Sequence, residues 1–118
     1  MSLNSLKAAA MPIRAYIFGR FTEESYHKVM NLTSEYEELS TRELVDAYNK
    51  GYETGFFGVY SQGLHFAAVH NAFIKRFGVS PFYAVGLYIA FTKEIVLTEE
   101  GNWSFVEPDI ALYEKGRG

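Results

Sequence analysis

The chain begins with alternating apolar and polar positions and then changes to helical spacing. Residues Pro12 to Phe18 alternate with period two and are rich in β-formers, which predicts a first strand. Thr22 precedes two glutamates, and acids in a first turn favour a helix start because they complement the N-terminal dipole. We expect this helix to run to about Asn31, or on through the acidic run at 35–38, and to bury Tyr26, Val29 and Met30.

Ser40 and Glu43 mark the start of a second helix. Their spacing is that of a capping box, in which each side chain bonds the other residue's backbone N–H, and Leu39 and Leu44 are spaced as a hydrophobic staple. The helix is expected to end at Gly51, with these residues turned inward: Leu44, Val45, Tyr48 and Tyr52.

The segment Gly55–Gly78 forms the longest apolar stretch, and no acidic residue lies between 53 and 94. On a helical wheel its large residues share one face, with Phe66, Phe73 and Phe77 inside an arc of roughly 40°. Ser61 is the expected N-cap, and Gly78 suits the left-handed C′ position. Its small residues, Ala68 and Ala72, would let a second helix or subunit approach closely.

The chain after Pro81 has the composition of strands. Tyr83–Phe91 is a nearly continuous apolar run, typical of a central strand buried on both faces, and Gly86 suggests a bulge or close approach. Whether Tyr83–Leu97 forms one strand or two stays open. The remaining predicted elements are a hairpin whose strands are 95–97 and 103–106, joined by a turn at 99–102, and a short element at 110–113.

Helices and strands are therefore segregated, which predicts an α+β fold. We expect an antiparallel sheet of about four strands covered on one face by three helices, in the order strand-helix-helix-helix-strand-strand-strand. The expected organisation is one domain over 12–114, preceded by a disordered extension or expression remnant (1–11) and followed by a mobile tail (115–118).

Composition narrows the possible functions. The 14 acidic and 11 basic residues give a net charge of −3, which disfavours nucleic acid as a partner. The absence of cysteine excludes disulfides and thiolate metal sites. Residues 54–74 are uncharged, but their glycines and polar side chains make a poor membrane helix, so a cytoplasmic protein is the expectation.

The glycine spacing between Gly58 and Gly63 is that of a phosphate-binding P-loop. The phosphate-binding Lys and the magnesium-binding Ser or Thr are replaced by Leu64 and His65, which argues against nucleotide hydrolysis. Anion binding at the helix start remains an alternative. In the simpler interpretation, the glycines let the chain turn under an aromatic cluster.

Catalytic and metal-binding patterns are incomplete. Ser61 precedes a helix, but its glycine spacing is one residue longer than a nucleophile elbow requires. His65 and His70 are five residues apart, roughly 140° around a helix, and cannot bind one metal together. Glu24 and His27 have the E-x-x-H spacing of di-iron proteins in a single copy. We therefore expect no metal and no cofactor.

His70 lies on the apolar face of the long helix. A hydrogen-bonded core histidine is the preferred interpretation, and a ligand-facing or interface role is the alternative. The aromatic residues Phe56, Phe57, Tyr60 and Trp103 would pack into the core or form a platform for a sugar, base or peptide.

Three functional classes follow, in order of preference. The first is a non-catalytic interaction or assembly module, homo-oligomeric or with a protein partner, whose candidate interface comprises Phe56, Phe57, Ala68 and Ala72. The second is a small-ligand or anion-binding domain whose candidate residues are Gly58, Tyr60, Ser61, Gly63, His65 and His70. The third is an enzyme whose acid–base groups are His65, His70, or Glu24 with His27.

Overall fold

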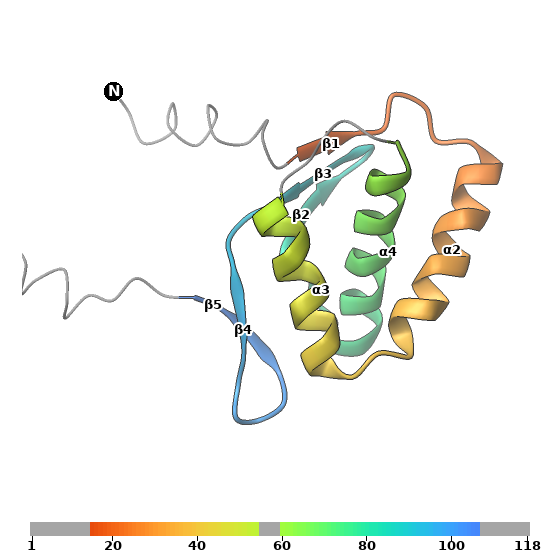
Figure 1. The fold of residues 1–118 in the computed structure, drawn as a ribbon. Helices are drawn as coiled ribbons and strands as arrows, with labels where there is room; N and C mark the ends of the chain where they lie inside the picture. Colours follow the sequence, from red (N-terminus) through yellow and green to blue (C-terminus); the bar gives the residue numbers. More distant parts are fainter. Residues whose placement is uncertain (1–14, 55–59, 107–118) are drawn as a thin grey trace, which may run out of the picture.

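A computed structural model describes residues 15–54 and 60–106 of the chain (Figure 1). Its elements, in order, are β1 (Ala15–Ile17), α2 (Glu23–Glu37), α3 (Thr41–Thr54), α4 (Tyr60–Phe77), β2 (Phe82–Val85), β3 (Tyr88–Phe91), β4 (Ile95–Leu97) and β5 (Trp103–Phe105). The α+β prediction is confirmed, with four strands after the helices where three were expected. The predicted extension, tail and element at 110–113 lie outside the described residues.

The strands form two antiparallel sheets, where we expected one of about four strands. One sheet has the order β1-β3-β2, and the other is the β4–β5 hairpin. The side chain of Asn49 in α3 explains part of the separation, because it bonds both backbone groups of Ile95. Its Nδ2 donates to the Ile95 carbonyl at 2.7 Å, and its Oδ1 accepts from the Ile95 N–H at 2.9 Å. This end of β4 is therefore held by a helix.

The helices α2 and α3 start where the sequence predicted. Thr22 accepts a hydrogen bond from the Ser25 N–H at 3.1 Å, and α2 then continues through the acidic run to Glu37. The capping box is confirmed, since the Ser40 N–H donates to Glu43 Oε1 at 3.0 Å and the Glu43 N–H to Ser40 Oγ at 3.1 Å. Tyr26, expected inside, is 51% exposed.

Helix α3 does not end at Gly51 but continues to Thr54. A methyl group at Gly51 would lie 2.8 Å from Cζ of Phe91 and 3.2 Å from Cε1 of Phe66. The glycine therefore permits close packing of the helix against aromatic rings, rather than a chain reversal.

Helix α4 begins at Tyr60, so Ser61 lies within its first turn instead of capping it. Its other end is as predicted: Gly78 has a φ of +80°, and its N–H donates to the Ile74 carbonyl at 2.8 Å.

The apolar run 83–91 is a hairpin and not one long strand. Gly86 has a φ of +57° and lies in the turn between β2 and β3. The register pairs Phe82 with Phe91 and Val85 with Tyr88. Only β3 occupies the central position predicted for the whole run.

The three helices lie side by side, with α4 between α2 and α3 and the three-stranded sheet behind them (Figure 1). Aromatic rings fill the space between helices and sheet. Tyr48 has its ring centroid 4.9 Å from that of Phe82 and 5.1 Å from that of Phe91, and Phe73 is fully buried. Among the described residues, no helix is long and apolar enough to cross a membrane.

Candidate functional site

The residues predicted to bind a ligand do not form one site. Phe56, Phe57 and Gly58 lie outside the described residues. Gly63 is buried within α4. The others divide between two hollows of the surface, which places His65 and His70 in different environments.

The first hollow lies between α2 and the start of α4 and has a volume of about 420 Å³. Tyr60, Ser61 and His65 line it, together with Lys28 and Glu35. His65 Nδ1 is hydrogen bonded to the Tyr36 hydroxyl at 2.8 Å. Burial, and then the nearby Glu35 carboxylate, raises the pKa of Tyr36, so this phenol keeps its proton at neutral pH. The hollow carries charged side chains of both signs, Lys28 and Glu35, beside apolar ones such as Leu32 and Leu64.

The second hollow, which we call the hairpin groove, has a volume of about 300 Å³. It lies between α2, α4, the residues after β1 and the β2–β3 hairpin. His70 stands in its wall, with Nδ1 2.8 Å from Ser80 Oγ and its ring edge-on to Phe82. Burial lowers the pKa of His70, so its ring is neutral at pH 7. The preferred interpretation of a hydrogen-bonded histidine agrees with this geometry, and the ring also borders a groove.

The small residues of α4 are packed inside the chain. Ala68 and Ala72 are 0% and 1% exposed. Their helix has α2 on one side and α3 on the other (Figure 1). These side chains let helices of the same chain pack closely, so they do not present a surface to another subunit.

The acid–base candidates on α2 are separated by their own ion pairs. Glu24 lies 3.4 Å from Lys28 Nζ, whereas His27 lies 3.7 Å from Glu23. All four side chains are solvent-exposed. Within the described residues, no three acid or imidazole side chains gather closely enough to hold a metal ion.

Trp103 belongs to the core side of the second sheet rather than to an aromatic platform. Its ring packs edge-on to Phe73 at 5.9 Å and to Phe105 at 5.2 Å between centroids. Among the described residues its buried Nε1–H finds no acceptor.

The side of the three-stranded sheet away from the helices carries an apolar surface that the sequence analysis did not single out. The register aligns Ile17, Tyr88 and Val85 across the three strands, and Tyr83 follows on the same face. Ile17 is 69% exposed and Val85 58% exposed. The rings of Tyr83 and Tyr88 pack edge-on, with centroids 6.0 Å apart. We call these four residues the outer sheet face.

Residues 82–85 carry no apolar–polar alternation that would have predicted this face, and in the structure only Phe82 of the four is buried. Phe82 is buried and Tyr83 is exposed, as expected for a strand with one covered side. Interpreting 83–91 as one doubly buried strand concealed the exposed face, because the chain reverses at Gly86.

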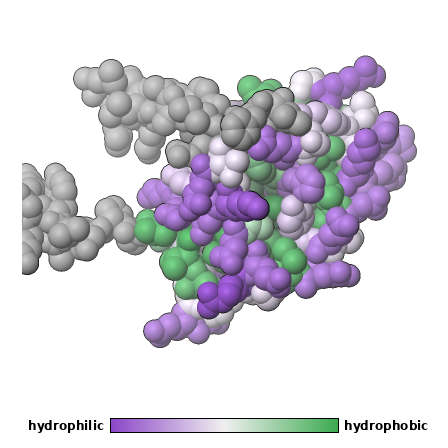
Figure 2. Space-filling view, viewed as in Figure 1, coloured by the Kyte–Doolittle hydropathy of each residue, from purple (hydrophilic) through white to green (hydrophobic). Residues whose placement is uncertain are grey.

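The helical side of the molecule is different in character. Figure 2 shows mostly hydrophilic residues over the three helices, with hydrophobic residues gathered over the β4–β5 hairpin. Val96 and Val106 are among the exposed apolar residues of that hairpin region. Most of the exposed large apolar side chains of the described residues lie in or beside strands, whereas Tyr26, Tyr60 and Ile74 lie on helices.

Comparisons with known proteins give no relationship on which a function could rest. No protein-family model matches the chain, and no curated protein or solved structure is significantly similar to it.

Proposed function

We propose that this protein is a non-catalytic assembly module that forms a homodimer through its outer sheet face. The observation that carries the proposal is the row of Ile17, Tyr88 and Val85, which lies across all three strands with both ends more than half exposed. Contiguous apolar surface of this kind marks interaction sites in soluble proteins. Tyrosine is also enriched at interface centres, because its ring is apolar and its hydroxyl can bond at the rim.

A second copy is the partner that this face suits best. The four residues of the outer sheet face carry no charge at neutral pH, so two copies can meet there although each chain has a net charge of −3. Twofold symmetry would place Val85 of one copy among the same apolar residues of the other. Two such sheets pack face to face about 10 Å apart, with their side chains interdigitated.

Two valines of nearly equal exposure provide a matched test. Val85 lies on the outer sheet face, and Val79, which is 59% exposed, lies between α4 and β2 outside the sheets. Sedimentation equilibrium of the unaltered protein should give twice the chain mass of 13.4 kDa. Val85→Lys should give the single-chain mass, because two desolvated lysines would face each other, while Val79→Lys should stay dimeric.

The contrary results are equally distinct. An unaltered protein that sediments as a single chain at all accessible concentrations would contradict the homodimer. A dimer that both lysine variants retain would show that another surface forms the contact. Circular dichroism of each variant separates loss of association from loss of folding.

A further inference from the structure

The hairpin groove has features of a small-molecule site, independent of any dimer. Its volume of about 300 Å³ is at the lower end of the range for ligand pockets. Aromatic side chains contribute to its wall, namely Phe18, Phe21 and Tyr26. Two polar side chains on consecutive positions of α4, His70 and Asn71, also line it. Aromatic walls with a few polar groups are the usual composition of a ligand site.

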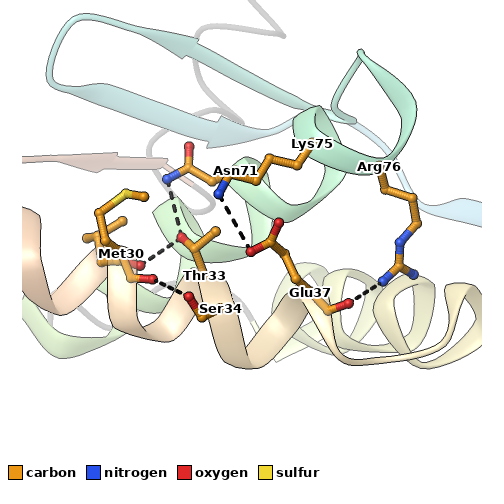
Figure 3. A network of polar contacts seen from close by, with 8 residues as sticks. Met30, Thr33, Ser34, Glu37, Asn71, Lys75 and Arg76 are labelled. Atoms are coloured by element: carbon orange, nitrogen blue, oxygen red, sulfur yellow. Dashed lines mark hydrogen bonds and ion pairs between the residues drawn. The ribbon is translucent and has the colours of Figure 1, made fainter.

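The orientation of the Asn71 amide follows from its neighbours on α2. Thr33 donates its hydroxyl hydrogen to the Val29 carbonyl at 2.7 Å, so Thr33 Oγ1 can only accept from Asn71. Asn71 must therefore turn its Nδ2 toward Thr33, at 3.4 Å. Figure 3 shows the amide nitrogen directed at Thr33 and the oxygen pointing away from it. Among the described residues, Asn71 Oδ1 has no donor, which leaves an acceptor for a ligand.

The hydrogen bonds of Ser80 determine the His70 proton in the same way. Ser80 Oγ already accepts from the Phe82 N–H at 3.1 Å. If Ser80 donates its own hydrogen to His70 Nδ1, every atom of the His70–Ser80–Phe82 contact is paired; if Nδ1 carries the proton, the serine hydrogen is left over. The fully paired arrangement puts the imidazole proton on Nε2, the ring nitrogen without a partner among the described residues. That N–H is a donor for a ligand.

The residues that line the hairpin groove indicate the charge of its ligand. None of the described residues that line the groove is acidic or basic apart from His70, and the titratable side chain beside it there is the phenol of Tyr26, since Tyr88 turns its ring to the outer sheet face. Burial keeps His70 neutral at pH 7. An ionised ligand would lose hydration without gaining an opposite charge, so an uncharged molecule fits better.

We propose that the hairpin groove binds a flat, uncharged molecule with an N–H donor next to a C=O acceptor, the pattern of a cyclic amide. The ligand carbonyl would accept from His70 Nε2–H, its N–H would donate to Asn71 Oδ1, and its ring would pack against the aromatic wall. This pairing uses the two side-chain groups of the groove, His70 Nε2–H and Asn71 Oδ1, that have no partner among the described residues.

A pair of probes that differ by one methyl group tests the hydrogen bonds on the unaltered protein. 2-Quinolone carries the amide pattern, and N-methyl-2-quinolone lacks only the N–H donor. In an NMR titration, 2-quinolone should shift signals of Asn71, Gly86 and Leu87, and leave Lys28 and His65 in the other hollow unchanged. Its Kd should be lower than that of the methylated probe by about tenfold, the value of one hydrogen bond.

Matched protein variants test the imidazole. His70→Phe keeps an aromatic ring but removes the Nε2–H donor, and should weaken 2-quinolone binding by about tenfold. His65→Phe makes the same change outside the groove and should leave the Kd unaltered.

Three results would overturn the proposal. They are equal affinity for the two probes, equal effects of the two histidine variants, or shifts only outside the groove at millimolar probe concentration. The probe pair needs no substitution, so a His70→Phe variant that fails to fold leaves the test intact.

Discussion

Gly51 occupies a position in α3 where a side chain would meet buried aromatic rings. Phe91 is 3% exposed, and its ring is fixed by Phe66 and Phe82, whose centroids lie 4.7 Å and 4.8 Å away. The ring next to Gly51 therefore has little room to move aside. For a substitution by alanine, helix propensity would stabilise the protein and the clash with Phe91 would destabilise it. Because the added methyl group would lie only 2.8 Å from the ring, we expect the clash to be the larger effect.

Gly51→Ala is expected to destabilise the protein by about 1 kcal/mol. Alanine gains about 1 kcal/mol of helix propensity, but overpacking a core costs about 1–3 kcal/mol. Urea denaturation measures the difference. In a Phe91→Leu background, which removes the opposing ring atoms, the same change should become neutral or stabilising. A Gly51→Ala protein more stable than the unaltered chain would contradict this prediction and show that the Phe91 ring can move aside.

His70 is expected to make stability fall in mild acid. Because burial lowers its pKa in the folded state, the unfolded chain binds a proton first as pH drops through about 6.5. Stability is then lost until the folded-state pKa is reached. The decrease in Tm between pH 8 and pH 5 should be smaller in His70→Gln than in the unaltered protein. His27 and His65 are common to both proteins, so parallel decreases would contradict the assignment.

At the scale of elements, α4 holds the end of α2 through one side chain. Arg76 Nη2 donates to the Glu37 carbonyl at 2.8 Å and to the Leu39 carbonyl at 2.6 Å (Figure 3 shows the first bond). These carbonyls lie at the C-terminal end of α2 and just beyond it, where no further helical turn supplies a backbone N–H to them. The guanidinium thus joins α4 to the end of α2 and to the link between α2 and α3.

Arg76→Met is expected to cost about 1–2 kcal/mol, because it removes both charge-assisted bonds and keeps the apolar stem. Lys75→Met is the neighbouring control. Its ammonium lies 3.6 Å from Glu37 at the surface, and such pairs contribute about 0–1 kcal/mol. Denaturation midpoints compare the two variants. Equal losses would mean that general charge, and not the carbonyl contacts, accounts for the effect.

The elements differ in how well the sequence predicted them. Helix boundaries set by local hydrogen bonds, such as the Ser40–Glu43 box and Gly78, were confirmed because their determinants lie within a few residues. Gly51 was misinterpreted because its reason is a ring forty residues away. Part of the split into two sheets likewise involves Asn49, which bonds the backbone of Ile95 forty-six residues away. Side chains that bond distant backbone leave no periodic pattern.

At the scale of the whole molecule, the composition predicted an α+β domain but not where its surfaces would lie. His70 was identified from its place on an apolar face, and its groove depends on the β2–β3 reversal, which the apolar run concealed. Ala68 and Ala72 were taken for an interface because small residues serve packing within and between chains alike. The outer sheet face emerges only when three separate strands are aligned, so the dimer prediction belongs to this scale.

The pairing of β1 with β3 also constrains the order in which the chain can fold. Ala15 lies beside Ala90, and all three helices are connected within the loop that this pairing closes. During synthesis the first strand leaves the ribosome long before its neighbour exists. The helices can pack early through nearby contacts, whereas the sheet must wait for almost the whole chain. A chain that ends before residue 88 would therefore have its three helices without β3, and its aromatic core would be open on that side.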